Sequence, residues 1–488
     1  MGRIPSVHSL QICDSFFDAH IFFVFKNNFY LAIAYNYNTQ TTAMLKLFDL
    51  RLLSLLTVLA FSTCRAQIFS SNSALIQVNS GALVYSNGGI DLNGSSQFTN
   101  NGTIYATKNS TLPLNGNFSI NGSSTCAGNG TYYIEQDWKN NSVFTGGSST
   151  VHLYGNTEQF ITSDNSTETI FNHLILTGSG SGTDKRKTLL NTNASCGNQG
   201  NLTLNNRELA TEGNTFSVLN PSLSAIAFDN TFLAEGFVSS ILSGSLVRNT
   251  NSTQNYIFPV GSSNGTERFR AVTIQPEANS PQSYAVRFNN YSADIDSYFL
   301  IQHETLIDNG NSLFYHSIER ISGSANANVG VQYLPSSDGD WKGLAHWFLP
   351  IQQWNALGDL PQTINGNYSE ILRSGWNFPD ASNAYALINP ADIIIIPTAF
   401  TPDGDGVNEL WEIPNLDKQY PNNVVRIYNR WGSLLYEHDS STDGSYATAP
   451  WDGTVKGDLM PVGSYYYIID FNNLDNKSVK GIVTIVND

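Results

Sequence analysis

The chain has 488 residues, of which 13% are charged and 12% aromatic, and its formal net charge is −16. That length is too great for one compact core and predicts two to four domains of about 100–200 residues each. An acidic chain without a long run of Lys or Arg lacks the electrostatic surface of a nucleic-acid-binding protein, so that class is excluded. Gly, Asn, Ser and Thr alternate over short distances with Val, Ile, Leu, Phe and Tyr, which indicates an all-β protein.

An export signal is predicted inside the numbering. Residues 52–61 form an apolar run that follows Lys46 and Arg51 and precedes small Ala66. This is the pattern of a signal peptide over residues 44–66, cut after Ala66. Residues 1–43 are then interpreted as an upstream extension from a misassigned start codon, with a short amphipathic element as the alternative. Their apolar part is interrupted at Lys26 and is too short for a membrane span, which needs about 20 residues.

Cleavage there leaves Cys126 and Cys196 as the cysteines of the mature chain. Export places them in a compartment where a disulfide can persist. Each lies in a polar turn, so the sequence leaves open a Cys126–Cys196 bond or two isolated thiols. Neither has a histidine nearby in sequence, and we expect no catalytic thiol.

Residues 67–250 are predicted to be a train of short strands. Asn, Gly and Ser separate apolar segments of four or five residues that recur at irregular intervals. Strands that short bury a face only when successive coils stack on a shared interior, which favours a β-helix or β-solenoid. A Greek-key sandwich is the alternative. The expected strands cover residues 74–78, 81–85, 89–92, 102–106, 130–134 and 150–154.

A second region, residues 255–392, has longer alternating strands at 270–275, 284–288 and 329–333. Period-two patterning with turns between the strands predicts a β-sandwich of immunoglobulin-like size. Four tryptophans gather here, and they are expected either in the core or on a carbohydrate-stacking platform. They are Trp341, Trp347, Trp354 and Trp376.

The last region, residues 393–488, carries five motifs in a fixed order. A Pro-Asp-Gly-Asp-Gly turn at 402–406 comes first, and four further motifs follow it. Their residues are Arg430, Trp431, Gly432, Trp451, Asp452, Gly453, Gly463, Tyr465, Lys480 and Gly481. This segment closely resembles the gliding-motility-associated C-terminal domain, the type B sorting domain of type IX secretion substrates in Bacteroidota. Ile482 departs from the family pattern, because relatives commonly have tryptophan there.

The resemblance implies how the protein is delivered. It implies a small immunoglobulin-like sandwich that the outer-membrane secretion machinery recognises after export to the periplasm. The protein is then released or held at the cell surface, and the sorting residues are those of the five motifs. The preceding region is cargo, about which the resemblance says nothing.

The acidic turn in this region also offers oxygen ligands. Asp403, Asp405, Asn408 and Glu409 are of the type that binds Ca²⁺, but Val407 stands where an EF-hand loop needs a donor. A calcium loop and a plain turn therefore remain the two interpretations, and no other cofactor is expected.

No convincing catalytic motif is present. The Gly-x-Ser-x-Gly string at 261–265 leads into a strand, whereas a nucleophile elbow opens a helix. We therefore expect a non-catalytic surface protein for adhesion, matrix or gliding-related contact. The rival is a secreted carbohydrate-active enzyme or polysaccharide-binding protein with its groove on the solenoid. Clustered carboxylates and exposed aromatic residues on one face of residues 67–250 would favour the rival, and an even Asn/Ser/Thr coat would favour adhesion.

Overall fold

The computed structural model describes residues 9–14, 17–26, 28–35, 68–109, 115–357, 362–379, 382–391, 394–404, 406–472 and 477–486. The predicted signal peptide at 44–66 lies outside the described residues and stays a prediction. Two compact units are present: unit 1 comprises Met1–His303 and Gly310–Ile388, and unit 2 comprises Glu304–Asn309 and Asn389–Asp488. Near the N-terminus, three antiparallel strands are β1 (Ser9–Asp14), β2 (Phe17–Lys26) and β3 (Asn28–Tyr35).

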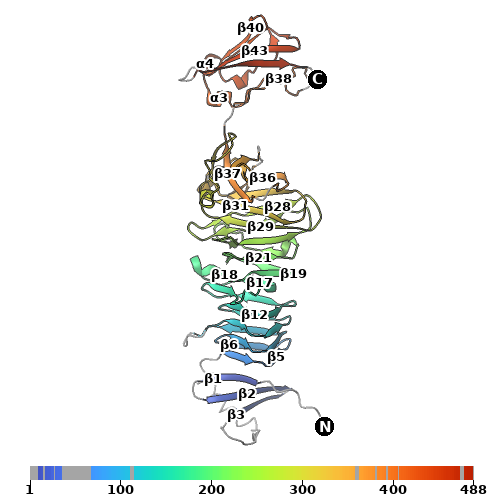
Figure 1. Ribbon diagram of the computed structural model, residues 1–488, viewed down its shortest axis with the longest axis vertical. Helices are drawn as coiled ribbons and strands as arrows, with labels where there is room; N and C mark the ends of the chain where they lie inside the picture. Colours follow the sequence, from blue (N-terminus) through green and yellow to red (C-terminus); the bar gives the residue numbers. More distant parts are fainter. Residues whose placement is uncertain are drawn as a thin grey trace. The chain divides into compact units, whose positions relative to one another are not determined.

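Unit 1 contains the predicted solenoid. In its first coils each strand pairs in parallel with the third strand after it, so that three sheets lie side by side along the solenoid (Figure 1). The first sheet continues the antiparallel strands β1–β3 with a parallel part. That part consists of β4 (Phe69–Asn72), β7 (Ile90–Asn93), β10 (Phe118–Ile120), β13 (Trp138–Asn140), β16 (Gln159–Thr162), β18 (Arg186–Leu190), β20 (Glu208–Ala210) and β23 (Phe237–Ser239). The second consists of β5 (Leu75–Val78), β8 (Gln97–Asn100), β11 (Thr125–Ala127) and β14 (Val143–Thr145). The third begins with β6 (Leu83–Asn87), β9 (Thr103–Thr107), β12 (Thr131–Ile134), β15 (Thr150–Leu153), β17 (Thr169–Leu176), β19 (Ala194–Thr203), β21 (Thr215–Val218) and β24 (Ser245–Thr250).

Asparagines at the strand ends form the corners that turn the chain from one short strand into the next. Asparagines lie above one another at one corner, where Asn121 Nδ2 donates to Asn93 Oδ1 at 3.2 Å and Asn141 Nδ2 donates to Asn121 Oδ1 at 3.0 Å. Alternate side chains of strands such as β7, β12 and β15 are buried inside the coils, and the Phe118 and Trp138 rings stack with centroids 4.9 Å apart. Stacked coils thus satisfy the corner amides and share one apolar interior. The structure is mostly β, as the sequence predicts, and the long parallel sheets make the described residues of 68–250 solenoid-like.

The third sheet does not stop at the end of the parallel coils. β24 pairs antiparallel with β29 (Gln282–Asn289), and the sheet continues through further antiparallel strands. These are β31 (Tyr315–Ser322), β37 (Ala384–Pro390), β33 (Gly343–Phe348) and β34 (Gln353–Ala356). A second antiparallel sheet comprises β25 (Tyr256–Phe258), β28 (Val272–Pro276), β32 (Ala327–Tyr333), β36 (Tyr368–Trp376) and β35 (Gln362–Asn365). The change near residue 255 is therefore one of strand direction within a continuous sheet.

Short elements complete unit 1. They are η1 (Gly182–Lys185), η2 (Leu223–Ala225), β22 (Ile226–Ala227), the hairpin β26 (Gly261–Ser262) and β27 (Arg268–Phe269), η3 (Ala293–Asp296) and α2 (Pro335–Asp338). β30 (Ile307–Gly310) lies where the two units divide the chain. One hydrophobic core runs from the solenoid into both antiparallel sheets. Three of the four tryptophans are buried, and Trp341 is half-buried with its indole nitrogen donating to Asp338 O at 2.8 Å, so they are packing residues and not an open platform.

Unit 2 is built around one mixed five-stranded sheet. Its order is β38–β44–β43–β39–β40, with β38 parallel to β44 and the others antiparallel. The strands are β38 (Ala399–Phe400), β39 (Val424–Tyr428), β40 (Leu434–Asp439), β43 (Gly463–Asp470) and β44 (Ser478–Ile485). Its short elements are α3 (Leu416–Gln419), α4 (Ser440–Asp443), η4 (Tyr446–Thr448), β41 (Thr454–Val455) and β42 (Asp458–Leu459). Across the described residues of both units, no helix is long and apolar enough to cross a membrane.

Candidate functional site

The turn between β39 and β40 presents a tryptophan to solvent. Asn429 Oδ1 accepts hydrogen bonds from the backbone N–H groups of Trp431 at 3.0 Å and Ser433 at 2.9 Å, and Gly432 adopts a φ of +80°. Only glycine takes that φ at little cost, so Gly432 lets the turn close. Trp431 is 74% exposed, and the Arg430 guanidinium carbon lies 4.2 Å from its ring centroid. This cation–π contact keeps the positive charge of Arg430 next to the exposed Trp431 ring.

A groove lies beside this turn on the outer face of the sheet. Tyr428, Tyr466 and Ile482 are direct cross-strand neighbours on β39, β43 and β44, and Lys480 lies next to them. The groove has a volume of about 760 Å³. Its lining residues are Tyr428, Asn429, Arg430, Gly432, Tyr466, Tyr467, Ile468, Lys480, Gly481 and Ile482. This lining is aromatic, aliphatic and basic, with no carboxylate.

Alternation along β43 explains why one tyrosine faces the groove. Tyr465 and Tyr467 are buried, whereas Tyr466 between them is exposed, as the period of a strand requires. Gly481 pairs directly with Tyr467, and a Cβ at this glycine would lie 2.3 Å from the Tyr467 hydroxyl oxygen. The glycine of the Lys480-Gly481 motif therefore leaves room for the buried ring.

The Trp451-Asp452-Gly453 motif is internal to the fold. Trp451 is fully buried, and its carbonyl accepts a hydrogen bond from Trp411 N–H at 2.8 Å. Asp452 Oδ1 accepts from the Thr454 N–H at 2.9 Å and from its hydroxyl at 2.8 Å, while Gly453 has a φ of +75°. These residues build the core and a turn. Tyr465 likewise supports the fold, because it is buried and donates to Pro461 O at 2.6 Å, and Gly463 has a φ of +152°, a conformation that favours glycine.

The acidic turn is closed by its own glutamate. Glu409 Oε1 accepts a hydrogen bond from Gly406 N–H at 2.8 Å, and the Asn408 carbonyl accepts one from Thr401 N–H at 2.9 Å. Asp405 lies outside the described residues, so the calcium loop of Asp403, Asp405, Asn408 and Glu409 stays a prediction.

Cys126 and Cys196 are free and buried. Cys126 Sγ lies 3.4 Å from the Tyr132 hydroxyl oxygen. Burial raises the pKa of each thiol to about 12. Both therefore stay protonated at neutral pH and are poor nucleophiles.

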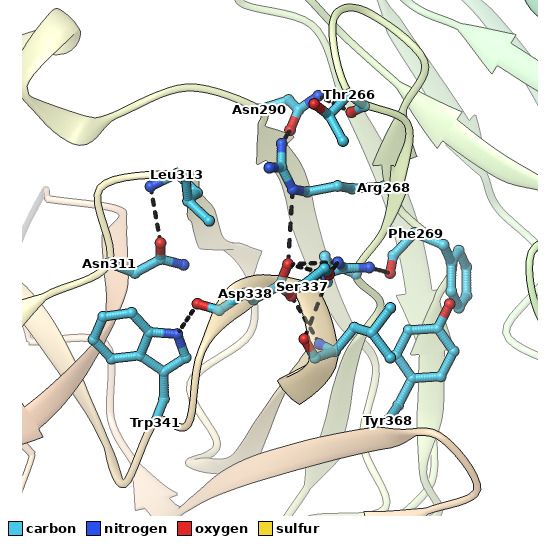
Figure 2. A network of polar contacts seen from close by, with 12 residues as sticks. Thr266, Arg268, Phe269, Asn290, Asn311, Leu313, Ser337, Asp338, Trp341 and Tyr368 are labelled. Carbon is cyan, nitrogen blue, oxygen red and sulfur yellow. Dashed lines mark hydrogen bonds and ion pairs between the residues drawn. The ribbon is translucent and has the colours of Figure 1, made fainter.

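A buried charge cluster lies in unit 1 at α2. The Asp338 carboxylate accepts hydrogen bonds from Arg270 Nη2 at 2.6 Å, from Ser337 Oγ at 2.9 Å and from Leu334 N–H at 2.8 Å, and Arg268 approaches it at 3.7 Å. Figure 2 shows Asp338 between Arg268 and Ser337, with Trp341 bonded to its carbonyl. The Asp338 side chain is 0% exposed. Protein groups therefore occupy the acceptor positions of the Asp338 carboxylate, as in a buried ion pair with a structural role. We call this cluster of Arg268, Arg270, Ser337 and Asp338 the Asp338 lock.

Two other ionisable groups with shifted pKa values are enclosed as well. Burial lowers the pKa of His316 to about 4 and that of Lys187 to about 7. Lys187 Nζ donates to Gln159 Oε1 at 2.6 Å and to Gly155 O at 2.9 Å, so it is held by hydrogen bonds in the interior. Within the described residues, no three His, Cys, Asp or Glu side chains gather so that they could hold a metal ion.

Sequence reasoning found Arg430, Lys480 and Gly481 but not the groove that they line, and it found exposed Trp431 in the adjoining turn. The partners it missed are Tyr428 and Tyr466. The alternation of Tyr465 to Tyr467 in a predicted strand was the available signal, since one of three successive tyrosines must face away from the core.

Unit 2 is thus a β-domain with a mixed five-stranded sheet, buried motif residues and an exposed groove. Residues 394–485 match the family described as the CHU_C Type IX secretion signal domain. The resemblance recognised from the motifs is thereby confirmed. The signal implies secretion to the cell surface or beyond it, and interaction with the type IX secretion machinery. No curated protein matches the chain.

Proposed function

We propose that this chain is a non-catalytic surface protein that serves in adhesion, matrix or gliding-related contact. The signal domain carries the proposal, because it makes the cell exterior the place where unit 1 works. The burial and internal hydrogen bonding of Asp338, His316 and Lys187 support a structural and not a catalytic use of these groups.

The proposal includes the finer architecture and processing. The two antiparallel sheets of unit 1 serve as the middle β-sandwich over residues 255–392, and unit 2 serves as a small immunoglobulin-like sandwich. A signal peptide at 44–66 delivers the chain to the periplasm. After outer-membrane passage, the protein is released or held at the surface.

We assign docking of the outer-membrane machinery to the groove of unit 2. Exposed Trp431 supplies an aromatic anchor of the type that dominates protein interfaces. Arg430 and Lys480 make the groove basic in a chain whose net charge is −16, so an apolar partner surface with an acidic rim is complementary to it. The buried motif residues then serve the fold that carries this surface.

The export test uses the full chain in a bacterium that has the type IX pathway. We expect deletion of residues 393–488 to retain the protein in the periplasm, and W431A or the charge reversal R430E/K480E to reduce surface delivery strongly. L459A, an exposed apolar substitution away from the groove, is the matched control. Normal export of the deleted chain would contradict the signal function, and normal export of both groove variants would contradict the docking surface alone.

A carbohydrate-active enzyme or polysaccharide-binding protein is the second candidate. Exposed aromatic residues on one solenoid face favour its binding part, as described below. A polysaccharide-degradation screen on the secreted protein tests the enzymatic part. Release of soluble sugar products would overturn the non-catalytic proposal.

A further inference from the structure

A column of aromatic side chains runs along the outer face of the third sheet of unit 1. Tyr85, Tyr105, Tyr133 and His152 are direct neighbours on β6, β9, β12 and β15. The Tyr105 and Tyr133 ring centroids are 4.6 Å apart at an interplanar angle of 6°, and those of Tyr133 and His152 are 4.3 Å apart at 17°. Tyr85 ends the column, tilted by 32° against Tyr105 at 6.1 Å.

A second column lies two residues earlier in each of these strands. It consists of Leu83, Thr103, Thr131 and Thr150, which are paired in the same register. The residues between the two columns, such as Ile104, face the core. The two columns form a flat strip about 7 Å wide, since alternate residues of a strand are separated by two rises of about 3.3 Å.

The strip carries no formal charge. Burial lowers the pKa of His152 below its usual value, so its imidazole is neutral at neutral pH. Tyr154 and Glu135 lie at its border, and the Glu135 carboxylate already accepts a hydrogen bond from Lys108 N–H at 2.7 Å. The strip itself therefore offers phenol, hydroxyl and imidazole groups beside aromatic and aliphatic carbon.

Stacking also fixes this surface before any ligand arrives. Rings held against their neighbours lose little freedom on binding, which favours affinity. Tyr85 is 64% exposed, so its ring offers the largest apolar area of the strip. A charge-free surface with alternating apolar area and hydroxyl groups is complementary to a neutral sugar polymer, whose ring C–H groups pack on aromatic carbon while its hydroxyls form hydrogen bonds.

We propose that this strip binds a neutral polysaccharide whose chain runs along the solenoid. The proposal rests on the adhesive function proposed above and names the ligand class of that function. A protein partner in place of a polysaccharide would show as binding to none of the polymers tested, an outcome that overturns the proposal. An acidic polymer fits less well, because the chain has a net charge of −16 and the strip has no cation to attract it.

The test is co-sedimentation of the full secreted protein with insoluble cellulose, xylan, mannan and chitin, and with alginate gel as an acidic comparison. We expect binding to at least one neutral polymer, with little change when NaCl is raised to about 1 M, because no ion pair contributes. Y85A should weaken binding about tenfold, as expected for loss of an aromatic anchor. Y105F/Y133F keeps the ring stack, removes two hydroxyl groups and should weaken binding less.

F299A is the matched control, since Phe299 is an exposed aromatic residue outside the strip. Thermal unfolding of each variant shows whether it keeps the fold. If Y85A does not fold, Y105F/Y133F still tests the strip. Binding to no neutral polymer, binding to alginate alone, or equal binding by wild type and both strip variants would overturn the proposal.

A cell-attachment assay separates this proposal from the adhesive function. If deletion of the gene reduces attachment but Y85A and Y105F/Y133F do not, adhesion stands and the strip is not its site. If the purified protein binds a polysaccharide through the strip and gene deletion leaves attachment unchanged, the strip proposal stands and the adhesive function is wrong.

Discussion

The two units place their aromatic residues by different rules. In the solenoid, one coil repeats the position of the last, so Phe118 stacks on Trp138 inside and Tyr105 stacks on Tyr133 outside. In unit 2, each aromatic residue has its own environment, and Trp451 is buried while Trp431 is 74% exposed. In the solenoid, the pairing register between coils decides which aromatic residues stack, whereas in unit 2 individual turns decide where each one lies. Stacking between coils leaves no local sequence motif, but a turn does.

The largest expected effect tests whether strand register alone stabilises unit 1, and it concerns the ion pairs of the Asp338 lock at α2. D338A leaves buried Arg270 and half-buried Arg268 without their carboxylate partner, and we expect it to lower the free energy of unfolding of unit 1 by about 3–5 kcal/mol. D340A is the matched control, because Asp340 pairs with Lys342 at the surface and its side chain is 65% exposed. Chemical denaturation of the full chain measures both. Equal stability of D338A and D340A would mean that register alone, and not this lock, stabilises the antiparallel end of unit 1.

A somewhat smaller effect is expected from pH. The folded protein keeps His316 neutral down to about pH 4, whereas the unfolded chain takes up that proton near pH 6.5. Between these values the unfolded state binds more protons, so the stability of unit 1 falls as the pH drops from 6.5 to 4, by about 3 kcal/mol in all. Denaturation midpoints at a series of pH values measure the slope.

The control for this slope uses two histidine variants. H316N removes the titrating group and should flatten the dependence, while H173N, at a half-buried position on β17, should keep it. His316 Nε2 donates to Arg270 O at 2.9 Å, and the shorter asparagine loses this hydrogen bond. That cost does not depend on pH, so it leaves the slope unaffected. An unchanged slope in H316N would assign the pH dependence to other groups.

Strand positions in the solenoid could be predicted from the sequence because Asn and Gly corners bound each short apolar segment. The expected strand at 130–134 corresponds to β12 (Thr131–Ile134), and the one at 150–154 to β15 (Thr150–Leu153). The aromatic strip could not be predicted, because the coils differ in length and no fixed period connects Tyr105 with Tyr133. The Asp338 lock joins residues from distant segments, and such pairs carry no local signal.

The boundary at 250–255 shows a further limit of sequence reasoning. Composition and strand length do change there, and the sequence therefore predicts separate regions. Hydrogen bonding between β24 and β29 nevertheless carries the sheet across, with Leu246 opposite Val286 and Arg248 opposite Tyr284. A change from parallel to antiparallel pairing alters the sequence pattern without ending the core. In unit 2, by contrast, motif residues marked turns and the core, which is why the family could be recognised.

The smallest of these effects tests whether a motif glycine serves the fold or the docking surface. G481A places a Cβ 2.3 Å from the Tyr467 hydroxyl oxygen and 2.5 Å from ring carbon Cζ, and we expect a loss of about 1–3 kcal/mol in the stability of unit 2 from this overpacking. Y467F/G481A removes the nearest atom and should recover part of the loss, measured by thermal unfolding. If G481A is as stable as wild type but is not exported, Gly481 belongs to the recognised surface of the groove. If it is destabilised and Y467F restores both stability and export, the glycine acts by making room for a buried ring, and recognition rests on exposed Trp431 and its basic neighbours.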